Sequence, residues 1–222
     1  MTKLPILVFG SSGHASVVID SIERQEYYEI AGLVDSFKPA GAMILGYPVL
    51  GTEAELAEIA RDRKVFGIVI AVGDNWQRAR VAARIRAASE LQMVSAVHPG
   101  AEVARGVEIG AGSVVMAGAV INRNVRIGPC CIVNTKASVD HDSSLEEFSS
   151  VAPGGTLAGN VRVGAYTAVC LQAAVTEKCS IGAHSVVGAG SVVLTDLPDH
   201  VLAYGVPARI IRTRKEDEPY VR

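Results

Sequence analysis

Residues 107–127 read VEIGAGSVVMAGAVINRNVRI, and an aliphatic residue stands at every sixth position of this stretch. The pattern continues without an insertion toward both ends of the chain. Its positions are Val97, Val103, Ile109, Val115, Ile121, Ile127, Val133, Val139, Leu145, Val151, Leu157, Val163, Val169, Val175, Ile181, Val187 and Val193. Neither an α-helix nor an ordinary strand repeats every six residues, but a parallel β-helix does, because three short faces form one triangular coil. We therefore predict stacked coils whose aliphatic markers point into the interior and whose tight corners hold small residues.

The chain before this repeat has a different pattern, in which apolar strands alternate with helices. A short irregular stretch around Gly41, Gly46 and Pro48 interrupts the alternation. Thr52 and Glu55 form a capping box at the start of the second helix. We predict strands over 4–9, 29–34, 65–72 and 91–97, and helices over 15–24, 52–62 and 75–90. Such alternation is typical of a small parallel sheet with helices on its faces.

These patterns divide the chain into three segments. We predict an α/β domain over 1–95, a β-helix over 96–198, and a C-terminal cap and tail over 199–222. Stacked coils need a cover at both ends. The N-terminal domain is expected to cover one end of the coils, and the tail after Leu197 the other.

Composition excludes several classes of partner. The 222 residues are 49% hydrophobic and 20% charged, and the net charge is −2, which gives no reason to expect nucleic acid or an anionic membrane. No segment approaches the ~20 apolar residues of a membrane span, and the start of the chain lacks a separate signal region. The four cysteines have no zinc-ligand spacing, so we predict no metal. We expect a cytoplasmic protein.

Several motifs resemble those of known acyltransferases. The run G-V-P-A-R at 205–209 is similar to a C-terminal signature of the hexapeptide acyltransferases, and G-S-S-G-H-A at 10–15 narrows the resemblance. Further matches lie at 134–135, 139–142, 147–149 and 158–160. Together they resemble the sialic-acid O-acetyltransferase and bacillosamine N-acetyltransferase branch, and within it the GDP-perosamine N-acetyltransferases.

This resemblance implies a left-handed β-helix, a Rossmann-like domain that binds a nucleotide sugar, and a homotrimer that uses acetyl-CoA. It also implies a place in O-antigen or lipopolysaccharide biosynthesis. The expected reaction is N-acetylation of a nucleotide-linked 4-amino-deoxysugar, with GDP-perosamine as the favoured substrate. The alternative is O-acetylation of a nucleotide sugar or of sialic acid by the same base.

His141 is the candidate general base. It stands two residues after its marker Val139 and should therefore point outward, and the carboxylates of Asp140 and Asp142 flank it. Histidine suits proton transfer because its pKa lies near neutrality. Asp142 stands where the family often has Glu, and we expect it to orient the imidazole. That contact requires a corner, since adjacent strand residues face opposite ways.

Gly159 follows His141 by one full coil and should lie directly above it. The resemblance implies that its N–H stabilises the thioester oxyanion, and it places Asn134 among the catalytic residues as well. Leu171 and Ala189, also one coil apart, would form a track for the pantetheine arm. The track lies on a different face from His141, so a neighbouring subunit would supply one half of the site.

Two further residues are expected to contact acetyl-CoA. The resemblance places Ser150 where the bacillosamine enzymes carry a histidine that touches acetyl-CoA, and Arg209 within the C-terminal signature. A cysteine acyl-enzyme is disfavoured because no cysteine has a histidine neighbour in the repeat. A zinc site within one subunit is disfavoured for a similar reason, since His98, His141 and His184 fall on different faces.

The nucleotide sugar is expected at the strand ends of the N-terminal domain. A turn with Gly10, Ser12 and Gly13 follows the first strand and opens a helix, which suits a phosphate. His14 would contact the phosphates or cap this helix. Asp35 ends the second strand, where ribose or base recognition is usual. Gly73 and Asp74 end the third strand and should face the same crevice.

Two other classes of function compete with this interpretation. A dehydrogenase is argued against because the chain has no catalytic domain beyond the β-helix. A non-catalytic scaffold would need neither His141 beneath Gly159 nor the C-terminal signature.

Overall fold

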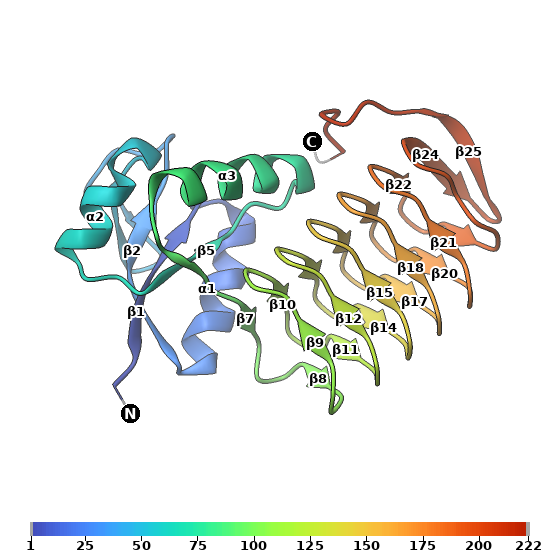
Figure 1. Cartoon of the computed structure of the whole chain (residues 1–222), viewed down its shortest axis with the longest axis horizontal. Helices are drawn as coiled ribbons and strands as arrows, with labels where there is room; N and C mark the ends of the chain where they lie inside the picture. The colour runs from blue at the N-terminus through green and yellow to red at the C-terminus, as the bar shows by residue number, and fades with distance from the viewer. Residues whose placement is uncertain (1, 221–222) are drawn as a thin grey trace.

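The N-terminal unit is built on a buried apolar strand, β1 (Leu4–Phe9), in a computed structural model that describes residues 2–220 (Figure 1). Its sheet has the order β3-β4-β2-β1-β5-β6. The other strands are β2 (Tyr28–Val34), β3 (Met43–Ile44), β4 (Tyr47–Gly51), β5 (Gly67–Ile70) and β6 (Gln92–Met93). All of them pair in parallel except β3 with β4.

The antiparallel pair β3–β4 corrects two predictions. The stretch expected to be irregular forms a hairpin, and the sheet is therefore mixed rather than wholly parallel. Leu45 and Gly46 connect the two strands with φ values of 52° and 85°. Positive φ at both central residues belongs to the tight turn that matches strand twist. Asn or Asp usually takes the first of these positions, and Leu45 gave no such signal.

Helices lie on both faces of the sheet, as predicted. They are α1 (Gly13–Gln25), α2 (Leu56–Asp62) and α3 (Asn75–Ala88), with a 3₁₀ turn η1 (Glu53–Glu55) before α2. The capping box of Thr52 and Glu55 is confirmed. None of the helices in residues 2–220 has the length and apolarity to cross a membrane.

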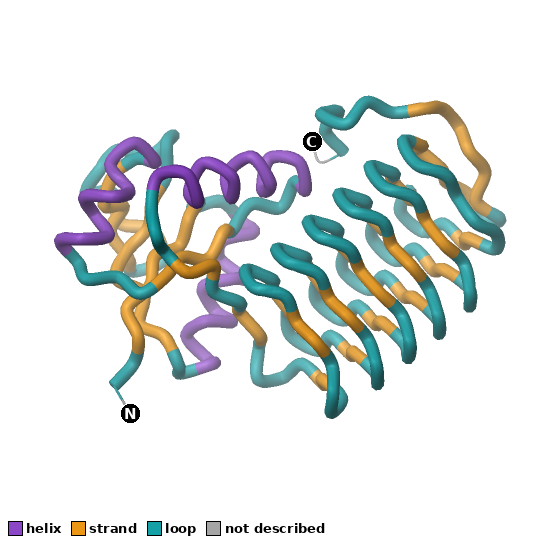
Figure 2. The backbone as a smooth tube through the Cα atoms, viewed as in Figure 1, coloured by secondary structure: helices purple, strands orange, loops and turns teal. Residues whose placement is uncertain are grey.

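The β-helix follows as three sheets of two-residue strands, separated by turns (Figure 2). The first sheet contains β7 (Ala96–Val97), β10 (Val114–Val115), β13 (Ile132–Val133), β16 (Ser150–Val151), β19 (Ala168–Val169) and β22 (Val186–Val187). The second contains β8 (Glu102–Val103), β11 (Val120–Ile121), β14 (Ser138–Val139), β17 (Thr156–Leu157), β20 (Ala174–Val175) and β23 (Val192–Val193). The third contains β9 (Glu108–Ile109), β12 (Arg126–Ile127), β15 (Ser144–Leu145), β18 (Arg162–Val163) and β21 (Ser180–Ile181).

The predicted register is confirmed in every coil. Val114 pairs with Ile132 and Val120 with Ser138, and all neighbouring strands repeat this offset of one coil. We name the corners by the sheets they join in chain order. The first corner joins the first and second sheets (for example 134–137), the second corner joins the second and third (140–143), and the third corner joins the third and first (146–149).

Each corner turns on one residue in the left-handed region, and this residue recurs every sixth position. The series is Gly106, Gly112, Gly118, Asn124, Cys130, Lys136, Asp142, Phe148, Gly154, Asn160, Tyr166, Gln172, Lys178, His184 and Gly190. The expectation of small corner residues is therefore wrong in part. Large side chains fit because they point outward from the corner, although glycine has less steric cost at positive φ.

The interior of the coils is an aliphatic column, and its two ends differ. At the C-terminal end, β24 (Val201–Gly205) joins β22 and pairs with β25 (Ala208–Thr213), so Val201 and Ala203 enter the core and confirm the expected cover. At the other end, Val103 remains 36% exposed. The N-terminal domain covers this end only in part, because it packs against the first sheet rather than across the coil.

The strand predicted over 91–97 divides between the two units. Its first part, β6, joins the N-terminal sheet, and its second part, β7, begins the β-helix. Helix α1 packs beside β7, and its Val18 shares a core cluster with Val114 and Ile132 of the first sheet. The two units are thus joined by a continuous apolar core.

A buried arginine joins the two units by hydrogen bonds. Arg78 of α3 is 1% exposed. Its guanidinium donates to the carbonyls of Val72 and Gly73 on one side and to those of Cys130 and Phe148 on the other. A fifth bond goes to Asn75 Oδ1. The positive charge is compensated by oxygen dipoles from both units, so the contact fixes α3 against the third corner.

Candidate active site

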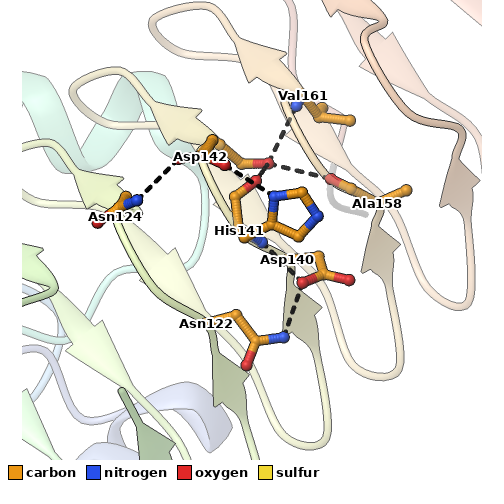
Figure 3. A network of polar contacts seen from close by, with 8 residues as sticks. Asn122, Asn124, Asp140, His141, Asp142, Ala158 and Val161 are labelled. Atoms are coloured by element: carbon orange, nitrogen blue, oxygen red, sulfur yellow. Dashed lines mark hydrogen bonds and ion pairs between the residues drawn. The ribbon is translucent and has the colours of Figure 1, made fainter. Parts of the chain in front are cut away.

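His141 lies at the second corner, directly after β14, and points outward as predicted (Figure 3). Its side chain is 55% exposed. The imidazole Nδ1 lies 2.8 Å from Asp142 Oδ2. An ionised carboxylate can only accept, so this contact places the proton of a neutral imidazole on Nδ1 and leaves Nε2 as the free base. The Nε2 atom has no hydrogen-bond partner in residues 2–220.

The corner geometry brings Asp142 to the ring. Asp142 has φ +59°, which turns its side chain back toward the preceding residue. Its hydrogen bond raises the pKa of His141, and the two neighbouring carboxylates act in the same direction. Asp140 has a different role, because its Oδ1 accepts the backbone N–H of His141 at 2.7 Å. One carboxylate therefore orients the ring and the other holds the backbone beneath it.

Gly159 lies over the imidazole, one coil above. The backbone of Asn160 donates to the His141 carbonyl at 2.9 Å, which fixes this register. The Gly159 N–H donates no hydrogen bond within the described chain. His141 and Gly159 are thus brought together as predicted.

Three other predicted residues lie at the first corner. Asn134 accepts the Thr135 N–H through its side chain and makes no hydrogen bond to His141 among the described residues. Leu171 and Ala189 stack in register, because the Gly190 N–H donates to the Leu171 carbonyl at 2.8 Å. Leu171 is half exposed. Within one chain the track and the histidine occupy different corners, as the coil arithmetic required.

The C-terminal tail covers Ser150. Figure 1 shows the chain after β25 passing back along the coils toward α3. Tyr220 Oη lies 3.3 Å from Ser150 Oγ and donates to the Gly73 carbonyl. Ser150 is 7% exposed, so a contact with acetyl-CoA would require displacement of the tail and stays a prediction. Arg209 lies exposed on β25, where its guanidinium donates to the carbonyl of Ala208.

A pocket of about 550 Å³ opens at the strand ends of the N-terminal domain. It brings together Gly10, Ser12, Asp35 and Gly73, four of the residues predicted there. Asp35 is fixed by two donors, since Ser11 Oγ bonds to Oδ2 at 2.5 Å and the Phe37 N–H bonds to Oδ1 at 2.7 Å. Glycine at position 10 is required by a φ of +100°.

The other three residues predicted at this end do not line the pocket. Gly13 begins α1, and Asp74 caps α3 by accepting the Gln77 N–H. His14 lies in the first turn of α1 and caps nothing. Burial and the nearby Arg78 lower its pKa to about 4, so it is neutral near pH 7. Its Nε2 is buried without a hydrogen-bond partner in the described residues.

Sequence reasoning missed several residues of these sites. Ser11 lies in the predicted turn but was not singled out. Phe37 and Arg84 line the pocket from the loop after β2 and from α3, and only the folded sheet brings them together. An aromatic column at the third corner was also missed. Its rings stack at centroid distances of 5.4 Å for Phe148–Tyr166 and 4.5 Å for Tyr166–His184. The spacing of one coil between these three residues was the available signal.

The stacked coils and the α/β domain before them together match the architecture of the hexapeptide acyltransferases. The PglD N-terminal domain family matches residues 5–85. The H141A mutant of GDP-perosamine N-acetyl transferase from Caulobacter crescentus, in complex with CoA and GDP-perosamine, is 38% identical. The alignment covers 93% of this chain and 96% of that one, with a TM-score of 0.88.

The acetyltransferase domain of PglB from Neisseria gonorrhoeae, in complex with acetyl coenzyme A, is 32% identical with a TM-score of 0.86. That alignment covers 95% of this chain and 100% of that chain. The chain therefore belongs to the hexapeptide sugar acetyltransferases with a PglD-type N-terminal domain. The predicted left-handed β-helix class, the family, and acetyl-CoA as the family's cosubstrate are confirmed.

Matches to curated sequences are short. The dTDP-3-amino-3,6-dideoxy-alpha-D-galactopyranose 3-N-acetyltransferase of Aneurinibacillus thermoaerophilus is 67% identical over 30 residues, which is 14% of this chain and 16% of that protein. The chain thus aligns with about a sixth of the length of this relative.

Proposed function

We propose that this protein transfers the acetyl group of acetyl-CoA to the amino group of a nucleotide-linked 4-amino-deoxysugar. The observation that carries the proposal is the free Nε2 of His141, held by Asp142 beneath Gly159. In this geometry the sugar amine attacks the thioester carbonyl while Nε2 accepts the amine proton. The Gly159 N–H donates a hydrogen bond to the oxyanion of the tetrahedral intermediate. Collapse of this intermediate breaks the C–S bond and releases CoA thiolate.

The sugar nucleotide would lie in the pocket at the strand ends. The turn after β1 and the start of α1 suit a diphosphate, because helix N-termini favour negative charge. Phe37 is 94% exposed at this pocket and offers a surface for a nucleobase. The complex of the Caulobacter relative with GDP-perosamine supports GDP-perosamine as the favoured substrate.

We infer that the complete site forms between subunits of a homotrimer. All residues that line the nucleotide pocket come from the N-terminal domain, whereas His141 lies at the second corner of the β-helix. The expected pantetheine track of Leu171 and Ala189 lies at the first corner. A neighbouring subunit would bring these parts together. A sedimentation mass of one 23.3 kDa chain with full activity would exclude this arrangement.

The direct test is an assay of free CoA thiol with acetyl-CoA and GDP-perosamine. We expect thiol release that depends on the amino sugar, with a product heavier by one acetyl group. GDP-D-rhamnose is the matched control, because this 6-deoxy sugar carries a hydroxyl at the position of the amine. Acetylation of the hydroxyl sugar alone would instead support an O-acetyltransferase, and no release with either would exclude the proposed reaction.

A further inference from the structure

We propose that Asn124 is a positioning residue for the catalytic histidine, acting through the carboxylate of Asp142 from the coil below. This inference rests on the proposed function, in which His141 is the base. It extends the site to a residue that contacts Asp142 and lies seventeen positions before the histidine in the chain. The chain of contacts runs from Asn124 to Asp142 and from there to the imidazole (Figure 3).

The two oxygens of Asp142 have separate partners. Asn124 Nδ2 donates to Oδ1 at 2.9 Å, and the imidazole Nδ1 contacts Oδ2 at 2.8 Å. A carboxylate held at one oxygen only can rotate about its terminal torsion, which is broad and roughly two-fold. The second bond removes this freedom. Asn124 therefore keeps Oδ2 in the plane and at the distance that the imidazole requires.

The coil register explains why these residues meet. Asn124 and Asp142 are 18 residues apart and occupy the same left-handed corner position, with φ values of 60° and 59°. Asn and Asp tolerate this conformation better than other non-glycine residues. Equivalent backbone geometry one coil apart points the two side chains in the same direction, so an amide below a carboxylate forms a hydrogen bond without rearrangement.

The neighbouring carboxylate has the same support. Asn122 Nδ2 donates to Asp140 Oδ1 at 2.8 Å, and the two residues are again 18 apart. Asp140 in turn accepts the His141 backbone N–H. Both carboxylates that flank the histidine are therefore held by asparagines of the preceding coil, one for the ring and one for the backbone.

The site is exposed, which makes this support necessary. The Asp142 side chain is 45% exposed, and water competes for its oxygens. The charged groups around the histidine are Asp140, Asp142, Arg123 one coil below, and Glu108, Arg126, Glu146 and Arg162 along the groove beside Asp142. Donation by Asn124 is the largest cause that lowers the pKa of Asp142, so this contact favours the ionised form that accepts from the imidazole.

Two substitutions test the inference while preserving the corner. Asn124→Gly removes the amide but suits positive φ, and Asn124→Asp keeps the shape but replaces the donor with an acceptor. We expect the pKa of His141, followed by NMR, to fall in the glycine variant because its bond to Asp142 weakens. It should rise in the aspartate variant, because a second negative charge lies nearby. We expect kcat to fall about 2- to 10-fold in the glycine variant, the value of one hydrogen bond.

Gln172→Gly is the matched control. Gln172 also occupies a left-handed corner position, with φ +53°, but at the first corner, and its side chain makes no hydrogen bond in the described chain. It should keep the His141 titration of the wild type, with melting temperatures showing that all variants fold. An unchanged His141 pKa in Asn124→Gly would overturn the positioning role and leave the base assignment intact. Full turnover by His141→Asn would overturn the base assignment instead, while leaving the hydrogen-bond chain measurable.

Discussion

A Cβ atom at Gly159 would come within 2.6 Å of both Cε1 and Nε2 of His141. The glycine is therefore required by the ring beneath it and not by its own backbone, which does not adopt positive φ. We expect Gly159→Ala to fold normally but to displace the imidazole. A displacement of about 1 Å can lower the rate by roughly 100-fold. Steady-state kinetics should show the loss in kcat, and Glu177→Ala, one coil above, should not. Wild-type kcat in Gly159→Ala would contradict this relationship.

His141→Asn should retain the fold and both binding affinities but lose turnover. Asparagine keeps one hydrogen-bonding group of similar reach but cannot accept a proton at neutral pH. Removal of a general base typically costs ~10²–10⁴-fold. Oxyanion stabilisation and proximity survive, so residual activity should be measurable. If the folded variant turns over within a factor of about three of the wild type, solvent water is a sufficient base.

The pH dependence of kcat/KM should reflect the His141–Asp142 pair. Because the hydrogen bond to Asp142 raises the pKa of His141 above 6.5, the imidazole stays protonated to a higher pH than usual. Activity should fall on the acid side with a midpoint above 6.5, where the base becomes protonated in the free enzyme. Asp142→Asn should move this midpoint to lower pH, because a neutral amide stabilises the imidazolium less. Superimposable profiles for the two proteins would refute the pairing.

Asp35→Ala should change KM for the sugar nucleotide without changing KM for acetyl-CoA. Asp35 lines the pocket proposed for the sugar nucleotide and lies far in the chain from the β-helix corners. We expect KM for the sugar nucleotide to rise about 10-fold, the value of one hydrogen bond to a charged group. KM for acetyl-CoA should stay nearly constant. Asp35→Asn tests the same point with the pocket shape preserved, and an equal rise in both constants would argue against separate binding regions.

Arg78→Met should destabilise the junction between the two units. The substitution leaves the carbonyls of Val72, Cys130 and Phe148 buried without their donor. Loss of a buried, charged donor costs about 2–4 kcal/mol of unfolding free energy. Arg80→Met on the same helix is the control, because Arg80 is exposed. Equal melting temperatures for the two variants would show that the hydrogen bonds of Arg78 contribute nothing to stability.

The β-helix could be predicted in detail because an aliphatic residue recurs at every sixth position of its sequence. A marker every six residues fixes the register, and the register alone places Gly159 above His141. The expected contact between Asp142 and the imidazole required a corner at this point, and the structure has one. Local sequence was sufficient here because each coil contacts only its neighbours.

The remaining features depend on contacts that no local pattern encodes. The hairpin at Leu45 and Gly46 lacks the usual turn residues, and the mixed sheet was therefore missed. Phe37 and Arg84 come together at the pocket of the N-terminal domain only after the sheet forms. The C-terminal tail covers Ser150 because its path brings Tyr220 beside Gly73, and these two residues are 147 positions apart in the sequence.

The six-residue recurrence of the left-handed corner limits how the length of this chain can change. Loss of six residues upstream of His141 would keep every marker inward, so the coils could still stack. It would nevertheless move the histidine by one face, from the second corner to the first, where residue 135 now lies. Loss of one whole coil would restore the orientation, since paired residues are 18 apart. Insertions and deletions that preserve catalysis should therefore occur as whole coils, or as loops that protrude from a corner without altering the count.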